Sequence, residues 1–144
     1  MALVYFDSSA FVKLLVEEEG SGLVAGLWDG CDAAVSSRLA YPEVRAALAA
    51  AARNCDLDEA DLDLAEQAWQ GYWLAIRPVE LTSAVEQHAG QLARDHALRG
   101  ADAIHLASAL AIGDPQLVVA VWDRRLRDAA RAARLRVAPN RATL

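Results

Sequence analysis

Residues 3–15 read LVYFDSSAFVKLL, and this stretch decides the fold class. Its opening, Leu3 to Phe6, is a short apolar run rich in β-formers, which predicts a strand. Asp7 follows the run directly and can cap a helix that begins near Ala10, because aspartate is among the preferred N-cap residues. The stretch therefore predicts a strand that leads straight into a helix, with a carboxylate at the junction.

The same alternation of apolar runs and helical spacing continues to the end of the chain. Further strands are expected at 33–35, 74–79 and 117–122, with a last short one at 136–138. Helical patterns cover 10–17, 22–28, 38–53, 58–74, 82–98 and 101–112, and an arginine-rich helix follows residue 123. Short strands that alternate with helices predict an α/β fold with a parallel sheet wrapped by helices. Ligands in such sheets bind at the carboxyl ends of the strands.

Length and composition narrow the class of protein. A chain of 144 residues is predicted to form one domain, residues 1–144, and its 55% apolar content indicates a folded globule. No stretch approaches the roughly 20 apolar residues of a membrane-spanning helix, and the opening MALVYFD does not resemble an export signal. Cys31 and Cys55 are isolated, with no CxxC motif and no histidine at metal-ligand spacing. We therefore expect a cytoplasmic protein with no membrane partner and no zinc site.

Four acids stand where an apolar segment meets a helical one: Asp7, Glu43, Asp102 and Asp123. Asp7 and Asp123 are also placed to cap the helices that follow them, and Asp102 to cap a helix that starts at Ala103. Glu43 fits a structural role less well, because its neighbours at helical spacing are apolar and an unpaired carboxylate is costly to bury there. Clustered carboxylates raise one another's pKa values unless a cation relieves the repulsion. The four acids therefore predict an acidic pocket that binds Mg²⁺ or Mn²⁺, which prefer oxygen ligands.

Three polar residues near these acids have two interpretations each. His105 lies one helical turn from Asp102 and is either a proton carrier or a packed helix residue. Ser8 and Ser9 are expected to cap the first helix, and the alternative is a hydrogen bond to substrate or to a pocket side chain.

Charge is unevenly distributed along the chain. The net charge is −6, yet residues 124–144 carry seven arginines against a single acid, Asp128. Basic residues of this kind populate the solvated face of a last helix. They also suit an acidic neighbour, either a phosphate backbone or an acidic protein surface, and the sequence leaves both interpretations open. Arg124 and Arg125 follow Asp123 directly, where they are placed to meet substrate phosphate at the pocket edge.

Four segments carry the acids in order: VYFDSSAFVKLLVEE, SSRLAYPEVRAAL, RGADAIHLASAL and VAVWDRRLRDAA. In these segments, and essentially from end to end, the chain resembles the PIN-domain ribonucleases, specifically the VapC toxins of bacterial toxin–antitoxin pairs. The resemblance implies a PIN-like three-layer α/β/α sandwich with a central parallel sheet. It also implies a homodimer that cleaves structured RNA, of the tRNA or rRNA class, with Mg²⁺ or Mn²⁺, and that is held inactive by a cognate antitoxin.

The resemblance and the residues together assign roles to the four acids. Asp7 and Asp102 are expected to anchor the cation, while Glu43 and Asp123 complete the catalytic site and orient the attacking water. One departure concerns the last acid. Many relatives place a hydroxyl residue two positions before it, where this chain has Val121.

Other protein classes with acids at strand ends fit less well. A haloacid-dehalogenase-type phosphatase uses a second aspartate two positions after the first, where this chain has Ser9. A response-regulator receiver needs an early acidic pair and a late lysine, whereas the only lysine here is Lys13. The remaining alternative is a PIN-like fold that acts as a catalytically inactive binding module for protein or RNA. The one residue that favours this alternative is Val121, because it replaces the hydroxyl residue of many relatives.

Overall fold

The computed structural model describes residues 2–140, in which one five-stranded sheet has only parallel pairs of neighbouring strands. The strand order is β3-β2-β1-β4-β5, so β1 lies at the centre. The strands are β1 (Leu3–Phe6), β2 (Ala33–Ser37), β3 (Ile76–Val79), β4 (Val118–Ala120) and β5 (Arg136–Ala138). All the predicted strands are confirmed, although the one expected at 117–122 is shorter and leaves 121–123 outside the sheet.

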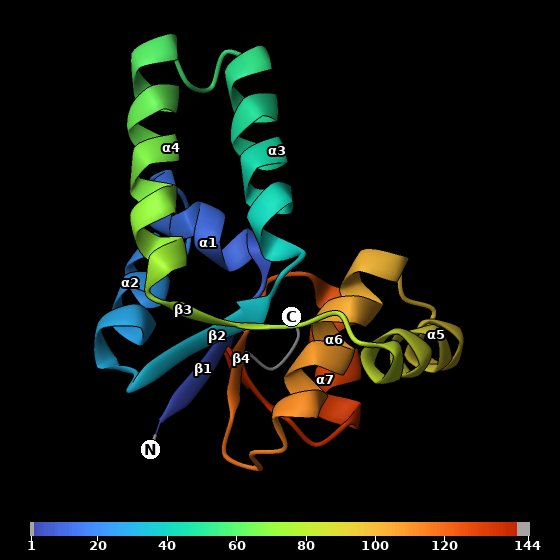
Figure 1. The fold of residues 1–144 in the computed structure, drawn as a ribbon. Helices are drawn as coiled ribbons and strands as arrows, with labels where there is room; N and C mark the ends of the chain where they lie inside the picture. The colour runs from blue at the N-terminus through green and yellow to red at the C-terminus, as the bar shows by residue number, and fades with distance from the viewer. Residues whose placement is uncertain (1, 141–144) are drawn as a thin grey trace.

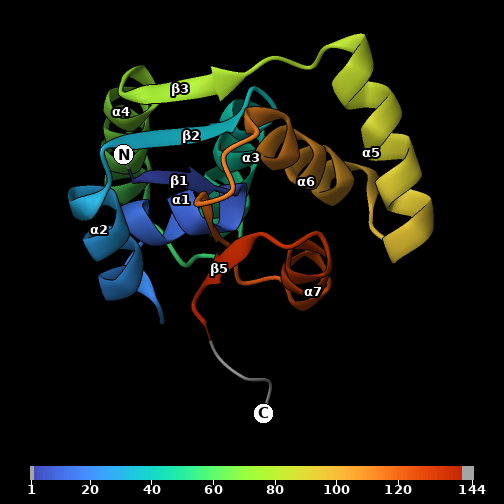
Figure 2. The same cartoon turned by 90° about the horizontal axis from the view of Figure 1, so that it is seen from below.

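Helices cover both faces of this sheet (Figure 2). One face carries α1 (Ser8–Leu15), α2 (Ser21–Gly30), α3 (Ala40–Arg53) and α4 (Glu59–Leu74). The other face carries α5 (Ser83–His96), α6 (Gly100–Ile112) and α7 (Arg124–Ala132). The architecture is the expected three-layer α/β/α sandwich. Between residues 2 and 140, none of these helices has both the length and the apolar character needed to span a membrane.

The alternation of side chains along β1 decides which half of the core each residue joins. Successive strand residues point to opposite faces of a sheet. Val4 and Phe6 accordingly pack with α1–α4, whereas Tyr5 packs with α5–α7, and all three are at most 5% exposed. A large apolar side chain buried in this way stabilises the fold by roughly 1.5–3 kcal/mol. The same alternation places the Tyr5 hydroxyl inside the core, where it needs a hydrogen-bond partner.

The junction of β1 and α1 forms as the sequence predicts. Asp7 has an extended backbone, with φ −78° and ψ 175°, and its side chain accepts a hydrogen bond from the Ala10 amide. Asp123 caps α7 in the same way through the amide of Leu126. Both predicted caps are therefore confirmed, and each holds a carboxylate at the end of a strand–helix connection.

The beginning of α6 differs from the expectation. The prediction that Asp102 caps a helix starting at Ala103 is wrong, because α6 begins at Gly100. Ala97 ends α5 in the left-handed conformation, with φ 52° and ψ 42°, and the chain reaches an extended Arg99, which is the N-cap. Asp102 therefore lies in the first turn of α6, where its carboxylate takes no part in capping.

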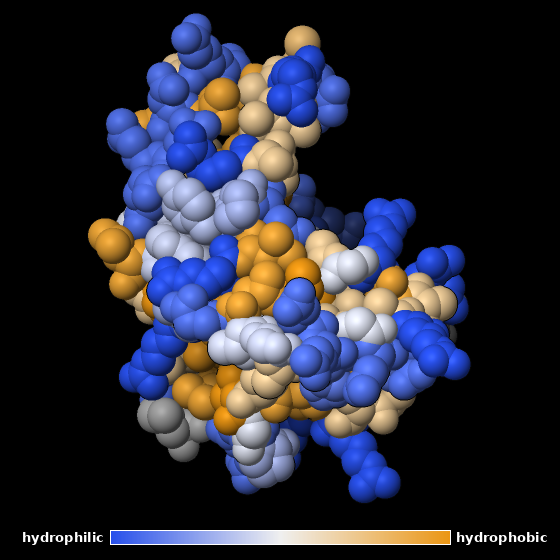
Figure 3. All heavy atoms as spheres, turned by 45° about the vertical axis from the view of Figure 1, so that its right-hand side comes forward, coloured by the Kyte–Doolittle hydropathy of each residue, from blue (hydrophilic) through white to orange (hydrophobic). Residues whose placement is uncertain are grey.

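Helices α3 and α4 form a hairpin that stands clear of the sheet (Figure 1). Pro42 falls in the first turn of α3, where proline is tolerated because first-turn amides have no partner within the helix. Trp69 of α4 is fully buried, and its ring centroid lies 4.9 Å from that of Phe11 in α1. This contact fixes the foot of the hairpin. Figure 3 shows hydrophilic side chains along its outer part and apolar surface near its foot.

Candidate active site

All four predicted acids lie at the carboxyl edge of the sheet, around its central strand. Asp7 directly follows β1, and Asp123 follows β4, which pairs with β1. Glu43 lies in the first turn of α3, which continues from β2, the other neighbour of β1. Asp102 lies in the first turn of α6. Its charge acts on Asp7, and the charges of Asp123 and Glu43 act on it, so the fold brings together four residues that are far apart in the sequence.

Asp7 is the most deeply buried of the four, with 5% of its surface exposed. Burial raises its pKa and the charge of Asp102 adds to this effect, although His105 and hydrogen bonds from Ser9 and Ala10 offset part of it. Both hydrogen bonds end on Oδ1, at 2.7 and 3.0 Å. Within residues 2–140 no hydrogen bond reaches Oδ2. One carboxylate oxygen is thus free to meet a cation.

Asp102 is half-buried, and its carboxylate receives no hydrogen bond from the described part of the chain. Burial is the main cause that raises its pKa, and the charges of Asp123 and Glu43 raise it further, while His105 and Arg99 lower it. Sequence reasoning missed Arg99. The available signal was a basic residue one helical turn before an acid at the start of a helix. Arg99 therefore supplies positive charge that partly offsets the negative charges of Asp123 and Glu43.

Glu43 is held by two side chains from other helices. Its Oε1 lies 2.6 Å from Ser8 Oγ and 2.6 Å from His105 Nε2. Burial opposes ionisation of Glu43, but the hydrogen bonds from His105 and Ser8, together with the charge of His105, outweigh burial and lower the pKa. Glu43 therefore ionises more readily than usual, whereas Asp7 and Asp102 resist ionisation.

Ser8 and Ser9 do not cap α1, so that prediction is wrong. Asp7 has the extended backbone that an N-cap requires, and Ser8 is already the first helical residue. Ser8 Oγ donates to Glu43, and Ser9 Oγ donates to Asp7. The alternative interpretation of the two serines is the one observed, because each hydroxyl bonds a side chain of the pocket.

His105 connects the carboxylates to the core. It is 3% exposed, its Nδ1 lies 2.7 Å from the Tyr5 hydroxyl, and its Nε2 faces Glu43. The two rings of Tyr5 and His105 pack edge to face, with an angle of 81° between their planes. The sequence places His105 near Asp102, but it contains no signal for a bond to Glu43, which is 62 positions away.

Asp123 marks the exposed rim of the cluster. Arg124 and Arg125, which follow it, are also exposed, and within residues 2–140 neither forms a hydrogen bond or ion pair. Val121 is fully buried, and its amide donates to the Ala138 carbonyl at 2.9 Å. The rim therefore presents a carboxylate and two free guanidinium groups to an approaching ligand. Arg141, the last arginine of the basic tail, lies outside the described residues.

At the carboxyl edge of the sheet, one pair of residues offers the oxygen ligands that suit a hard divalent cation. Across residues 2–140, no group of three or more His, Cys, Asp or Glu side chains is arranged to hold a metal ion. Asp7 and Asp102 nevertheless repel each other, and both retain carboxylate oxygens without hydrogen-bond donors. A cation bound between them relieves that repulsion, and carboxylate oxygens are the ligands that Mg²⁺ and Mn²⁺ prefer. The pair therefore fits the ion predicted from the sequence.

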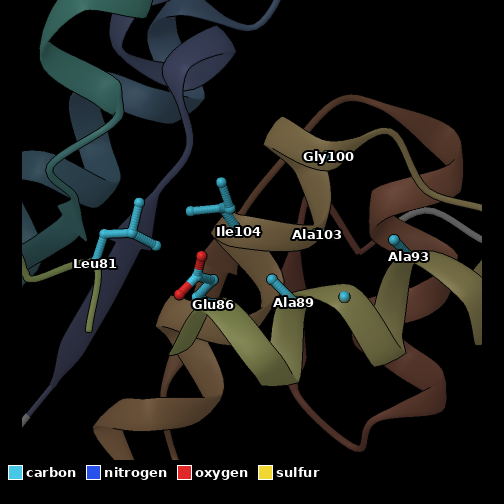
Figure 4. Close-up of a pocket in the computed structure, with 8 residues that line it drawn as sticks. Leu81, Glu86, Ala89, Ala93, Gly100, Ala103 and Ile104 are labelled. Carbon is cyan, nitrogen blue, oxygen red and sulfur yellow. The ribbon is translucent and has the colours of Figure 1, made fainter. Parts of the chain in front are cut away.

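An apolar groove of about 290 Å³ lies between α5 and α6 (Figure 4). Its walls consist mainly of small residues, among them Ala89 and Gly90 of α5 and Ala103 of α6. Among the described residues, Glu86 is the only charged side chain that lines it, and none of the four acids does. The groove therefore belongs to a different surface from the carboxylate cluster.

Comparisons with known proteins identify the family of this chain. The PIN domain family matches residues 4–132. Ribonuclease VapC45 of Mycobacterium tuberculosis (strain CDC 1551 / Oshkosh) and Ribonuclease VapC49 of the strain ATCC 25618 / H37Rv are each 74% identical over 139 residues, which is 96% of either chain. Ribonuclease VapC46 of the latter strain is 35% identical over 134 residues, 91% of this chain and 92% of its own. The crystal structure of FitAcB from Neisseria gonorrhoeae shares the fold, with a TM-score of 0.69, 20% identity and coverage of 93% and 95% of the two chains.

Proposed function

Because this chain belongs to the PIN-domain family and is a ribonuclease toxin of the VapC type, we propose that it hydrolyses structured RNA of the tRNA or rRNA class with Mg²⁺ or Mn²⁺. The observation that carries the proposal is the pair formed by the buried Asp7, at the end of the central strand, and the half-buried Asp102, in the first turn of α6. Burial raises the pKa of both, the charge of Asp102 raises the pKa of Asp7 further, and within residues 2–140 both carboxylates keep oxygens without hydrogen-bond donors. Such a pair is costly to a fold unless a cation binds there.

The two aspartates hold the ion in this proposal. When bound, a divalent cation screens the charge that develops on phosphate oxygens and lowers the pKa of a water molecule. Asp7 would offer Oδ2 to the ion, because its Oδ1 already accepts hydrogen bonds from Ser9 and the Ala10 amide. Asp102 approaches from the first turn of α6 with both oxygens free of hydrogen bonds in the described structure.

Glu43 and Asp123 complete the catalytic site in this proposal. Glu43 ionises readily and has one oxygen, Oε2, without a hydrogen bond inside residues 2–140, so it can orient the attacking water and accept its proton. Asp123 is the exposed acid and orients the same water from the rim. The hydrogen bonds that fix Glu43 leave it little freedom to turn away from the reacting phosphate.

Substrate approach depends on the charges at the rim. Four acids repel a phosphate backbone, and the net charge of the chain is −6. Arg124 and Arg125 directly follow Asp123 and form no hydrogen bond or ion pair within residues 2–140, and we infer that they contact the RNA backbone next to the scissile bond. Selection among RNAs then rests on RNA shape and on unpaired bases, because proteins recognise structured RNA mainly through these features.

The proposal also includes partners and location. We infer that the protein acts in the cytoplasm, that it forms a homodimer, and that a cognate antitoxin binds it and blocks cleavage. Relatives named as VapC ribonucleases support an antitoxin partner.

A catalytically inactive binding module remains the competing function. The residue that motivates it, Val121, is a buried core residue whose side chain contributes no hydroxyl near Asp123.

One experiment decides between the nuclease and the inactive module. Purified protein, freed of any bound antitoxin, is incubated with total RNA in the presence of Mn²⁺, in the presence of EDTA, and as the Asp7→Asn variant with Mn²⁺. We expect discrete fragments with Mn²⁺ only, at least about 100-fold weaker in the variant because a metal ligand is lost. Equal fragments under all three conditions would reveal a contaminating nuclease. No fragments under any of them would favour the binding module.

A further inference from the structure

We propose that His105, fixed from behind by Tyr5, is a positioning residue that holds Glu43 in the orientation needed for RNA cleavage. The inference rests on the proposed function and extends it, because neither residue is among the four acids. It concerns the chain of hydrogen bonds Tyr5–His105–Glu43–Ser8, which runs from the core on one side of the sheet to the carboxylate cluster.

Both ring nitrogens of His105 have partners, which fixes the ring. Nδ1 lies 2.7 Å from the Tyr5 hydroxyl and Nε2 lies 2.6 Å from Glu43 Oε1. A ring that is bonded at both ends cannot flip or rotate without breaking two hydrogen bonds. Burial enforces this, because Tyr5 is 0% and His105 is 3% exposed, so water cannot replace either bond.

The direction of the bond to Glu43 follows from the chemistry of the carboxylate. An ionised carboxylate can only accept hydrogen bonds, and Glu43 Oε1 already accepts one from the Ser8 hydroxyl. His105 therefore donates from Nε2 to Glu43. The Tyr5 hydroxyl contacts the other ring nitrogen, Nδ1, and so keeps Nε2 directed at the carboxylate, as buried partners of catalytic and metal-binding histidines do.

Two donors on one oxygen fix the plane of the Glu43 carboxylate. Ser8 Oγ donates to Oε1 at 2.6 Å, and His105 Nε2 donates to the same atom. The second oxygen, Oε2, has no hydrogen bond within residues 2–140 and is left for the reaction. The Glu43 side chain is 29% exposed, so this oxygen is accessible while the His105 behind it is closed to solvent.

Packing alone does not explain why polar side chains lie here. Tyr5 belongs to an apolar cluster that includes Leu106, Ala103 and Val35, and the buried hydroxyls of Ser36 and Ser108 lie near its own hydroxyl. Buried polar groups lose solvation, and apolar replacements of similar volume are often as stable or more stable. The phenol and the imidazole at this place both lie in the chain of hydrogen bonds that ends on Glu43, which is consistent with a role in orienting that carboxylate.

The test compares kcat and KM for cleavage of one defined RNA with Mn²⁺. We expect His105→Ala to lower kcat by about 10- to 100-fold, with KM within about 2-fold of wild type, as for other residues that orient a catalytic group. His105→Gln restores a donor near Nε2 and should recover most of that loss. Tyr5→Phe removes one hydrogen bond and should lower kcat by about 3- to 10-fold. Ser8→Ala, which lies nearer the surface, should act like Tyr5→Phe.

The matched controls are His88→Gln, an exposed histidine on α5, and Tyr41→Phe, whose hydroxyl bonds Arg45 and Gln70 away from the site. Both should keep wild-type kcat. A second readout needs neither RNA nor metal: ¹⁵N NMR of the metal-free protein should show the His105 ring protonated at Nε2 in the wild type. In Tyr5→Phe, the Nδ1 signal should shift, because that nitrogen loses its partner, while Nε2 stays protonated.

Each outcome has a distinct meaning. If kcat is unchanged in His105→Ala while circular dichroism shows a folded protein, the positioning role is wrong and the proposed function stands. Equal losses in His105→Ala and His105→Gln that follow their loss of thermal stability would likewise overturn it, because a merely structural role predicts no rescue. If the wild type shows no Mn²⁺-dependent cleavage, the proposed function fails and the positioning role fails with it.

Discussion

At the scale of single residues, Asp7 combines two roles that usually conflict. Its Oδ1 caps α1 through the Ala10 amide, which favours a negative charge at a helix N-terminus. Its burial and the nearby Asp102 disfavour that charge, and these effects prevail, because its pKa is raised. The ionised Asp7 carboxylate therefore destabilises the folded protein. Binding of a proton or of a cation removes this destabilisation.

The pH dependence of stability follows from this shift. A carboxyl group whose pKa is raised by folding contributes stability below its unfolded pKa, about 4, and loses it as the pH rises through the folded pKa. Asp7→Asn keeps an oxygen for Ser9 and the Ala10 amide but cannot ionise. We expect the variant to be more stable than the wild type by about 1–2 kcal/mol at pH 7, in EDTA, with the difference vanishing near pH 4.

Thermal or urea unfolding of both proteins between about pH 4 and pH 8 measures this difference. The control is Asp95→Asn, an exposed aspartate on α5 that should change stability by less than about 0.5 kcal/mol at every pH. A variant at position 7 that is less stable than the wild type throughout this range would contradict the argument. It would mean that capping dominates over burial.

At the scale of elements, the start of α2 depends on one glycine. Gly20 is the N-cap of α2 with φ +92°, and a Cβ there would lie 2.9 Å from the Trp122 ring. Trp122 also lies under the Lys13 ammonium, 5.0 Å from the ring centroid. Gly20→Ala therefore combines backbone strain with a clash against a side chain that is packed in place. We expect a loss of about 1–3 kcal/mol in the free energy of unfolding, measured in urea.

Gly26→Ala is the matched control on the same helix. A Cβ at Gly26 meets nothing within 4 Å, and the residue lies inside α2. Alanine is favoured over glycine in a helix interior, so this variant should be more stable by about 0.5–1 kcal/mol. Equal effects of the two substitutions would show that the Trp122 contact does not constrain Gly20.

The sequence predicted the helices and strands better than it predicted the contacts between them. The apolar runs and capping residues predicted all the strands, the parallel sheet and the caps Asp7 and Asp123, because these depend on neighbours in the chain. The start of α6 was misplaced, since it depends on the left-handed Ala97 that ends α5. The bond between His105 and Glu43 was beyond prediction, because it joins faces of two helices that only the finished sheet brings together.

At the scale of the whole molecule, the basic start of α7 should decide how RNA approaches an acidic protein. We expect Arg124→Glu/Arg125→Glu to weaken RNA binding by about 10-fold or more and to reduce the dependence of log Kd on log salt by about 1–2. Fluorescence anisotropy at several salt concentrations, with Ca²⁺ in place of Mn²⁺, measures both quantities. Arg53→Glu, at the exposed end of α3, is the control and should change neither by much. Unchanged binding in the double variant would remove these arginines from the RNA interface.

The central position of β1 has a consequence for the timing of synthesis. β1 is made first, but its partner β4 and the acid Asp123 belong to the last part of the chain. A growing polypeptide on the ribosome therefore holds Asp7 without a strand on that side of β1 until Val118–Ala120 have been made. The acidic pocket cannot assemble before Asp123 has been added. A nuclease built in this order lacks its complete set of carboxylates while the segments that carry Asp7, Glu43 and Asp102 are being made.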